Sequence, residues 1–307
     1  MNIKIRELAG GILNMDTVKI SKGISLVENA FAKEEAKELI KQIYPHTGSA
    51  HLIGITGPPG CGKSTLIGAL GEQISKVGYK VAILAIDASS PYSGGSILGN
   101  RIRMQESLDR YGIYMRSMAS RGMRGGLTRS IWDATKILDA AGFDYIIIET
   151  VGAGQSDFEI MNLADTTVVV LAPGLGDEIQ AIKAGLMEIG DIFVINKAEL
   201  EGAMIAIKDI QNSLILLPQK GWKKVVLPTV ARQKEGIEDL FMEIEKHKKF
   251  AVSDSDKVER ELNFAIEEMI REKVERVVES KDLNPYLNEL ISKKSDPYTI
   301  AKKVVDG

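Results

Sequence analysis

The sequence has little cysteine and histidine, and both shortages limit its chemistry. Its 307 residues include one cysteine, Cys61, and three histidines, His46, His51 and His247. A single cysteine excludes an intramolecular disulfide and a cysteine-based zinc cluster within one chain. Three scattered histidines argue against a histidine-rich metal store. This cysteine usage fits the reducing cytoplasm, where we expect the protein to reside.

The chain also lacks an excess of positive charge and any long apolar run. Lys and Arg together number 39 and Asp and Glu 42, which gives a net charge of −3. Generic nucleic-acid binding is therefore not expected, since it depends on a basic excess. No apolar run approaches the roughly 18 residues that a membrane span needs. Residues 1–4, MNIK, do not begin an apolar signal core. We expect neither nucleic acid nor a membrane as a partner.

Short apolar runs alternate with helical patterns between residues 51 and 250. The runs are rich in Ile and Val with little polar alternation, which is typical of parallel strands buried on both faces. They cover residues 52–56, 81–86, 113–116, 145–149, 167–171, 192–196 and 225–228. Helical patterns follow at 64–77, 97–111, 128–141, 179–188 and 237–248. The alternation predicts a doubly wound α/β core with a mostly parallel sheet, whose ligands bind beyond the carboxyl ends of the strands.

Helical regions flank this core on both sides. Residues 1–50 contain a helical repeat of apolar side chains at 36–43, which predicts an N-terminal helical arm. A polar stretch at 253–256 precedes an apolar stripe at helical spacing, formed by Leu262, Ile266, Ile270, Val274 and Val277. We predict an arm at 1–50, a core domain at 51–250 and a C-terminal helical arm at 251–307 that serves packing or dimerisation.

Residues 57–65 read GPPGCGKST and match the phosphate-loop pattern in full. Glycines let the backbone curl so that its N–H groups face phosphate oxygens, and the following helix N-terminus favours an anion. Lys63 would bind the β- and γ-phosphates, Ser64 would bind Mg²⁺ and Thr65 the α-phosphate. The alternative is a glycine-rich turn without a ligand. The expected phosphate site consists of Gly57, Pro58, Pro59, Gly60, Cys61, Gly62, Lys63, Ser64 and Thr65.

Two carboxylates end predicted strands above this loop. Asp87 and Glu149 are natural Mg²⁺ partners or water positioners, with a cap or turn residue as the alternative. Residues 149–156, ETVGAGQS, form a glycine-rich segment of the kind that moves when a γ-phosphate arrives or leaves. Gly152 could donate its N–H to that phosphate, and Gln155 is a weaker candidate for orienting water. The candidate catalytic residues are therefore Lys63, Asp87, Glu149 and Gly152.

A candidate base site follows the predicted strand at 192–196. Asn196, Lys197 and Glu199 occupy the place where GTPases carry Asn-Lys-x-Asp, whose carboxylate accepts from guanine N1 and N2. Glu199 keeps the carboxylate on an arm one methylene longer, so a guanine preference is expected. Val230, Ala231 and Arg232 follow the last strand, where GTPases place a loop whose backbone contacts guanine O6. The motifs together predict GTP or GDP with Mg²⁺ as ligands.

Long stretches of the sequence outside these motifs are also typical of one protein family. The chain resembles the methylmalonyl-CoA mutase-associated GTPases, the MeaB-like family once labelled ArgK-type transport kinases. The resemblance covers almost the whole chain. Its stretches are ISLVEN at 24–29, GITGPPGCGKST at 54–65, DASSPYSGGSILGNRIRM at 87–104, SRGMRGGL at 120–127, ETVGAGQS at 149–156 and APGLGDEIQAIKAG at 172–185.

The resemblance implies a P-loop GTPase core and a function. Members are slow GTPases that gate cofactor loading of adenosylcobalamin-dependent acyl-CoA mutases, and they are usually homodimers joined through the C-terminal arm. By the family pattern, Lys63, Ser64, Asp87 and Glu149 serve phosphate and Mg²⁺. Asn196, Lys197 and Glu199 serve guanine, and residues 230–232 close the base pocket. Residues 174–185, with Asp177, Glu178 and Lys183, look like the family's mobile loop that reports nucleotide state to the mutase.

The sequence departs from the family pattern at a few positions. Asn100 stands where the family typically has Asp near magnesium, which predicts weaker metal binding or slower hydrolysis. Ala88 replaces Pro, Glu199 replaces Asp, and Val230 stands where Ser is common. The chain has no Asp-x-His-x-x-Gly cobalamin pattern, so the mutase would be a separate polypeptide.

The sequence allows more than one role for two arginines and four methionines, and it allows three other functions for the chain. Arg121 and Arg124 either stabilise developing phosphate charge or lie in a solvated loop, and core filling is the favoured role for Met104, Met115, Met118 and Met123. A small-molecule or protein kinase is a second hypothesis, but it needs an acceptor pocket and a base that we do not find. A metal-insertion GTPase is a third, disfavoured by the scarcity of Cys and His. A scaffold that binds nucleotide without hydrolysing it is a fourth.

Overall fold

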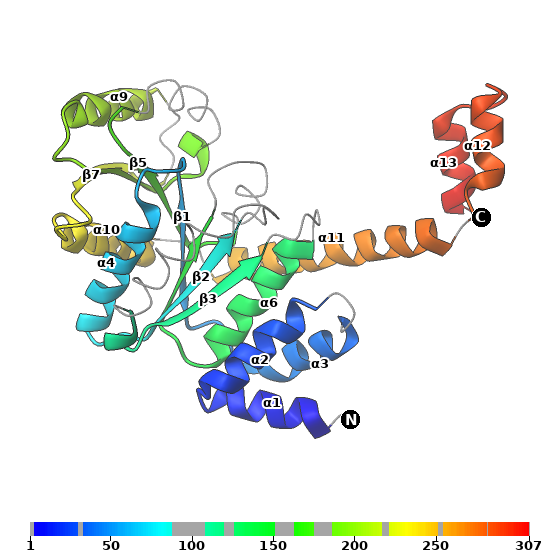
Figure 1. Ribbon diagram of the computed structural model, residues 1–307, viewed down its shortest axis with the longest axis horizontal. Coiled ribbons are helices and arrows are strands. Elements are labelled where there is room, and N and C mark those ends of the chain that lie inside the picture. The colour runs from blue at the N-terminus through cyan, green and yellow to red at the C-terminus, as the bar shows by residue number, and fades with distance from the viewer. Residues whose placement is uncertain are drawn as a thin grey trace. The chain divides into compact units, whose positions relative to one another are not determined.

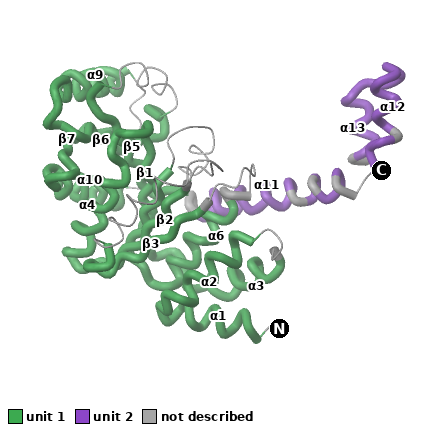
Figure 2. The backbone as a smooth tube through the Cα atoms, viewed as in Figure 1, with its two compact units in different colours: residues 1–251 green, residues 252–307 purple. Residues whose placement is uncertain are grey.

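The structure is a computed structural model, and its description covers part of the chain. The described residues are 3–29, 33–87, 108–119, 126–150, 163–174, 186–216, 221–250, 254–280 and 282–306. They fall into two compact units, residues 1–251 and residues 252–307, which Figure 2 shows in different colours.

A parallel sheet lies at the centre of the first unit (Figure 1). Among the described residues its seven strands are β1 His51–Thr56, β2 Val81–Asp87, β3 Tyr114–Ala119, β4 Tyr145–Glu149, β5 Thr166–Leu171, β6 Ile192–Asn196 and β7 Val225–Thr229. Their order is β3-β2-β4-β1-β5-β6-β7, and every neighbouring pair is parallel. The prediction of a doubly wound α/β core is confirmed. All the carboxyl ends therefore meet at one edge of the sheet, where such folds bind ligands.

Helices cover both faces of this sheet (Figure 1). In the first unit they are α1 Ile3–Leu13, α2 Thr17–Val27, α3 Lys33–Ile43, the short 3₁₀ helix η1 Tyr44–His46, α4 Lys63–Lys76, α6 Gly126–Ala140, α9 Ala203–Ile215 and α10 Ile237–Phe250. α4 and α10 pack together on one face, whereas α9 packs on the other. The three N-terminal helices pack on one another and on α6.

The apolar sequences of the strands are explained by the burial of both faces of the sheet. Successive strand residues point to opposite faces. In β5, Val168 and Val170 accordingly join the core with α4 and α10, while Val169 and Leu171 join the cluster with α9. Every residue of β5 is buried. Apolar side chains are thus required at consecutive positions, which is why these strands read as continuous Ile and Val runs.

A buried polar network closes the amino end of the sheet. The Thr166 hydroxyl lies 2.8 Å from His51 Nε2 and 2.8 Å from His247 Nδ1, and all three side chains are buried. His247 Nε2 is 3.5 Å from Asp191 Oδ1. Burial lowers the pKa of His247, although Asp191 and Asp165 oppose that shift. Two of the three histidines therefore join β1, β5 and α10 at the end of the sheet opposite the candidate site.

The second unit consists of helices, α11 Asp254–Ser280, α12 Asn284–Ile291 and α13 Pro297–Asp306. Many large apolar side chains of α11 are exposed: Val258, Leu262, Ile266, Met269, Ile270, Val274 and Val278. These positions recur every three to four residues and so form one stripe along the helix. In the described part of the chain, no helix combines the length and apolarity needed to cross a membrane.

The secondary structure differs from the sequence prediction in three helices. α1, α2 and α9 were not individually predicted, although residues 1–50 were expected to be helical. The helices expected at 97–111 and 179–188 lie mostly outside the described residues, which include only their ends at 108–111 and 186–188. Met118 is buried and Met115 packs partly buried against the core, as expected for core-filling side chains.

Candidate nucleotide-binding site

The loop between β1 and α4 has a backbone that only glycine can follow at two positions. Gly57 has φ +145°, and a Cβ atom there would lie 2.0 Å from the Val170 carbonyl oxygen of β5. Gly62 has φ +95°, and its Cβ would lie 2.4 Å from Asn196 Nδ2. Both conformations are unfavourable for side chains, and both spaces are occupied. The glycines of the motif are therefore needed to seat the loop against its neighbours.

Lys63 is the first residue of α4, and its side chain is buried. Its Nζ donates to the carbonyl oxygens of Gly57, at 2.7 Å, and Pro58, at 3.1 Å. An ammonium group has three donors, so these two bonds leave room for a phosphate oxygen. The helix N-terminus beside it adds partial positive charge. The loop and Lys63 thus form an arrangement suited to a polyphosphate.

Ser64 and Glu149 meet at the carboxyl edge of the sheet. The Ser64 hydroxyl, exposed at the start of α4, donates to Glu149 Oε1 at 2.6 Å, and Glu149 ends β4. A hydroxyl and a carboxylate are hard oxygen ligands of the kind Mg²⁺ prefers, so these residues fit that ion. Asp87 ends β2, but its side chain lies outside the described residues. Among the described residues no group of three or more His, Cys, Asp or Glu could hold a metal by itself.

Asn196 joins the phosphate loop to the segment after β7. It is buried at the end of β6, and its Nδ2 donates to the Cys61 carbonyl at 2.9 Å. Its Oδ1 accepts from the Ala231 backbone N–H at 3.1 Å and the Thr229 hydroxyl at 3.2 Å. One amide side chain therefore satisfies groups from both halves of the candidate site. Removing it would leave buried donors and acceptors without partners.

Lys197 and the residues after β7 complete the candidate base site. Lys197 has φ +57°, and its Nζ donates to the Gly60 carbonyl at 2.8 Å. The segment of residues 230–236, here termed the base loop, begins with buried Val230 and Ala231 and exposes Arg232. Glu199 is also exposed. The structure thus brings the Asn-Lys motif against the phosphate loop and the base loop against Asn196.

Cys61 contributes its backbone rather than its thiol. Its side chain is fully buried, and burial raises the pKa of the thiol even though Lys63 opposes the shift. A buried protonated thiol is a poor nucleophile. Its place within the loop is therefore explained by packing and by the carbonyl that Asn196 binds.

Several predicted residues lie outside the described part of the chain. They are Ala88, Asn100, Met104, Arg121, Met123, Arg124, Gly152, Gln155, Asp177, Glu178 and Lys183. Sequence reasoning also missed a contact within the described part, between Lys234 of the base loop and Glu72 of α4. The two residues are far apart in the chain, and no motif contains either of them.

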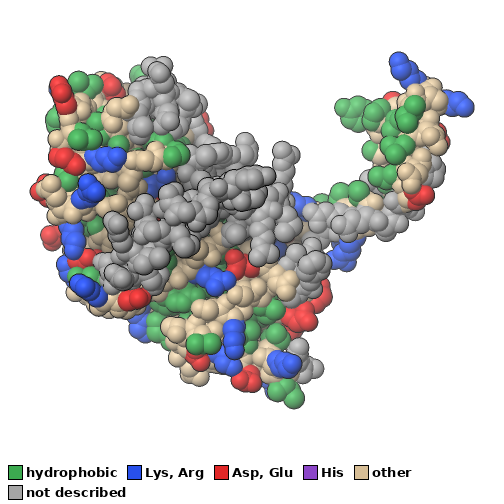
Figure 3. Space-filling model, viewed as in Figure 1, with side chains coloured by type: hydrophobic (Ala, Val, Ile, Leu, Met, Phe, Trp, Pro, Cys, Tyr) green, Lys and Arg blue, Asp and Glu red, His purple; other side chains and the backbone are tan. Residues whose placement is uncertain are grey.

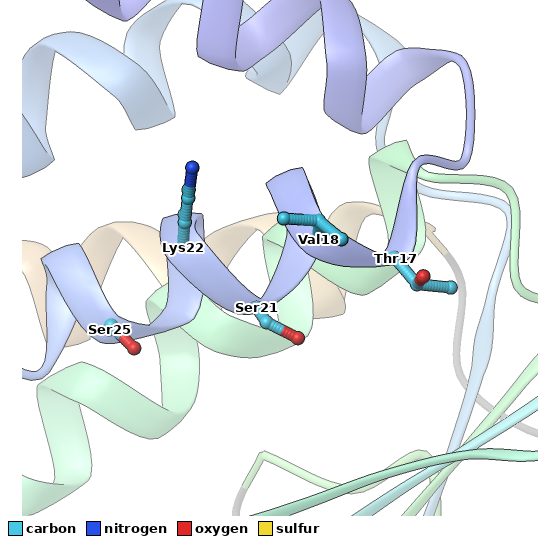
Figure 4. Close-up of a pocket in the computed structure, with 5 residues that line it drawn as sticks. All are labelled: Thr17, Val18, Ser21, Lys22 and Ser25. Atoms are coloured by element: carbon cyan, nitrogen blue, oxygen red, sulfur yellow. The ribbon is translucent and has the colours of Figure 1, made fainter.

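A shallow pocket lies on α2, away from these motifs (Figure 4). It is lined by Thr17, Val18, Ser21, Lys22 and Ser25. Figure 4 shows Ser21 and Ser25 on the side of α2 opposite Lys22. The Ser21 hydroxyl lies 3.0 Å from the Tyr114 hydroxyl, and Ser25 accepts from Arg116. These serines therefore attach α2 to β3, and none of the lining residues belongs to the phosphate loop or base loop.

Comparisons with known proteins find a matching family and similar chains. A family model described as methylmalonyl Co-A mutase-associated GTPase MeaB matches residues 20–283. A Pyrococcus horikoshii protein named as a GTPase is 43% identical over 98% of this chain and 98% of its own. The mitochondrial methylmalonic aciduria type A homolog of Mus musculus is 36% identical over 70% of this chain and 52% of its own. The crystal structure of an LAO/AO transport system kinase superposes with a TM-score of 0.74 at 24% identity, covering 100% of this chain and 98% of that one.

Proposed function

Because the chain belongs to the methylmalonyl-CoA mutase-associated GTPase family, we propose that it is a GTP-hydrolysing chaperone that gates cofactor loading of an adenosylcobalamin-dependent acyl-CoA mutase. The mutase is a separate chain, and the two meet in the cytoplasm. The family and its P-loop GTPase fold account for guanine-nucleotide binding. The observation that carries the proposal is the joining of phosphate loop, Asn-Lys motif and base loop through the side chain of Asn196.

The proposed hydrolysis uses the phosphate loop together with residues at or just after the ends of β2 and β4. Backbone N–H groups of residues 60–65 and the Lys63 ammonium bind the phosphates and stabilise the charge that grows as water attacks the γ-phosphate. Ser64 and Glu149 would hold Mg²⁺, with Asp87 as a further candidate, and the bound ion would neutralise phosphate oxygens. Gly152 is proposed to donate its N–H to the γ-phosphate. Loss of that phosphate would change the conformation of neighbouring segments, which is the useful output of a GTPase switch.

Glu199 is the proposed source of guanine selectivity. Its carboxylate would accept from guanine N1 and N2, a donor pair that adenine lacks. We expect GTP to bind at least about tenfold tighter than ATP, a gap of roughly 1.4 kcal/mol. Glu199→Ala should remove most of that gap and leave ATP affinity nearly unchanged. Calorimetric titration of both nucleotides into both proteins measures the effect.

Glu201→Ala is the matched control for this substitution, because Glu201 is an exposed carboxylate just two residues further on. It should leave the preference for GTP intact. Equal affinity of the unsubstituted protein for GTP and ATP would refute the proposed guanine site. An unchanged preference in Glu199→Ala would assign the selectivity to another residue.

The partner proposal is supported by two names, that of the matching family and that of the mouse relative. Both concern methylmalonyl metabolism, and methylmalonyl-CoA mutase is an adenosylcobalamin enzyme. If the chain serves such a mutase, adding the purified apo-mutase should change its rate of GTP hydrolysis, and GTP should control transfer of cofactor to the mutase. A rate indifferent to every acyl-CoA mutase of the source organism would refute this part.

We also propose that the protein is a homodimer joined through its second unit. The exposed apolar stripe of α11 supports this, as do Leu283, Leu287, Ile291 and Tyr298, which are exposed as well; Figure 3 shows apolar side chains gathered over α12 and α13. Exposed apolar patches of this extent favour burial against a partner. Ile270→Asp should convert the dimer to a monomer in sedimentation-velocity runs. Lys273→Asp, at an exposed polar position of the same helix, should not, and a monomeric unsubstituted protein would contradict the proposal.

A further inference from the structure

The base loop is tied to α4 by an ion pair that no motif contains. Lys234 Nζ lies 2.6 Å from Glu72 Oε1 and 2.8 Å from Oε2, so the ammonium bridges both carboxylate oxygens. Glu72 lies on α4, the helix whose first residue is Lys63, and it is only 4% exposed. A carboxylate buried this deeply needs a partner, because losing its solvation is costly. The Lys234 side chain is itself about half exposed, so it reaches this buried carboxylate from the solvent side.

Glu72 has two further partners, which keep it charged. Lys76, one turn later on α4, lies 2.8 Å from Glu72 Oε1. The Tyr111 side chain also donates to Glu72. Although burial raises the pKa of Glu72, hydrogen bonds from Lys234, Lys76 and Tyr111 bring it down to about 2. The carboxylate thus stays ionised at any pH at which the protein would be assayed, and Lys234 always has a charged partner.

The base loop itself has a constrained backbone. Lys234 has φ +62°, an unusual value for a lysine, and its N–H donates to the Ala231 carbonyl at 3.3 Å. Val230 N–H donates to the Glu235 carbonyl at 3.1 Å, and Gln233 N–H to the Val230 carbonyl at 2.9 Å. A Cβ at Gly236 would lie 2.4 Å from the Pro228 carbonyl oxygen. Hydrogen bonds within the base loop join its two ends, so a contact that holds Lys234 in place also restrains the backbone of residues 230–232.

This turn is held from two sides. Ala231 N–H binds Asn196 Oδ1 on the side of the Asn-Lys motif. The Lys234 side chain binds Glu72 on the side of α4, and Ala231 and Ile237 pack into the same core as Leu66 and Leu70 of α4. Residues 230–232 lie between these two attachments. Their backbone groups are the ones expected to meet the guanine base.

We propose that Lys234, held by Glu72, is a positioning residue that fixes the base loop on the phosphate-loop helix and so sets the selectivity for guanine. Lys234 acts through the backbone of residues 230–232 and does not itself contact the nucleotide. This inference rests on the proposed function, because it deepens the account of the same base site. A guanine base needs donors and acceptors placed within a few tenths of an ångström, whereas phosphate contacts depend mainly on the loop at 57–65.

Lys234→Met tests this, because it keeps the apolar stem of the side chain and removes the ammonium. Lys76→Met is the matched control, since Lys76 binds the same Glu72 oxygen, but its other neighbour is the Tyr111 ring rather than the base loop. Each protein is titrated with GDP and with ADP in the presence of Mg²⁺. We expect the ratio of GDP to ADP affinity to fall about tenfold in Lys234→Met, because the base loop loses its side-chain attachment to α4, and to change less than twofold in Lys76→Met.

Lys234→Arg should restore the ratio, since a guanidinium can bind both carboxylate oxygens. A purely stabilising role would lower the melting temperature in both Met variants and leave the affinity ratio unchanged, and this result would overturn the proposal. So would an equal loss of GDP and ADP affinity in Lys234→Met. If Lys234→Met does not fold, Glu72→Gln is compared with the unsubstituted protein instead. This substitution weakens the Lys234–Glu72 contact but keeps a polar side chain of the same size at position 72. An unsubstituted protein without guanine preference would instead refute the proposed function.

Discussion

Replacing Lys63 by alanine is expected to lower GTP hydrolysis at least about a hundredfold, because it removes the side-chain cation that stabilises the transferring phosphoryl group. Lys63 is buried and its Nζ is held by two carbonyls of the phosphate loop, so the ammonium is already placed for this role. Phosphate release under saturating GTP measures the loss. Binding of nucleotide should weaken as well, because the charge also serves the ground state.

The same variant separates a switch from a scaffold. If GTP hydrolysis controls the loading of cofactor into the partner mutase, Lys63→Ala should abolish that control while the protein stays folded. If bound nucleotide serves only stability, the variant should melt at a lower temperature and still regulate the mutase. Lys76→Ala, at an exposed lysine at the opposite end of the same helix, controls for the loss of one positive charge from α4. A rate of GTP hydrolysis in Lys63→Ala close to that of the unsubstituted protein would contradict the proposed mechanism.

Replacing Gly57 by alanine is expected to destabilise the first unit by about 3 kcal/mol or more, since the methyl group meets a backbone atom and the backbone angle is unfavourable. The added Cβ would lie 2.0 Å from the Val170 carbonyl oxygen. That oxygen belongs to the interior strand β5, which cannot move without disturbing its neighbours β1 and β6. The free energy of unfolding in urea measures the cost, and nucleotide binding should be lost with it.

Gly60→Ala is the matched control in the same loop. Gly60 also has a positive φ, +78°, but a Cβ there meets nothing within 4 Å. Only the backbone penalty applies, about 1 kcal/mol, so the variant should fold and bind nucleotide. Equal destabilisation by the two substitutions would mean that β5 does not confine the loop at Gly57.

The strands and the phosphate loop could be predicted from the sequence because their signals are local. β4 and β6 were placed to the residue, since strands buried on both faces must be apolar at every position. α9 was missed because Ile205, Met204 and Ile215 are exposed and blur the apolar stripe, and because β-branched residues are poor helix formers. α1 and α2 were missed because they contain glycines at 10, 11 and 23, and glycine has a low helix propensity.

The contacts that hold the site together could not be predicted, because they join distant segments. Asn196 was identified as a base-site residue, yet nothing in its motif shows that it binds Cys61 and Ala231 at once. Lys234 and Glu72 lie in different motif-free segments, and a lysine in a polar turn normally indicates only a solvated surface. The roles of Asp87, Gly152 and Glu199 stay predictions that the variants above and nucleotide titrations can test.

β1 lies at the centre of the sheet but is the first of its strands to be synthesised. Ile53 of β1 pairs with Ile147 of β4 on one side and Thr166 of β5 on the other, so both neighbours leave the ribosome long after β1 does. Until then the apolar sides of β1 and α4 stay exposed to solvent. Exposed apolar surface of this kind makes a nascent chain prone to aggregation, which chaperones prevent. The nucleotide pocket is complete only once Ala231 has emerged. A nascent chain that stalls between Asn196 and Ala231 therefore carries the phosphate loop and the Asn-Lys motif without the base-loop N–H that Asn196 binds.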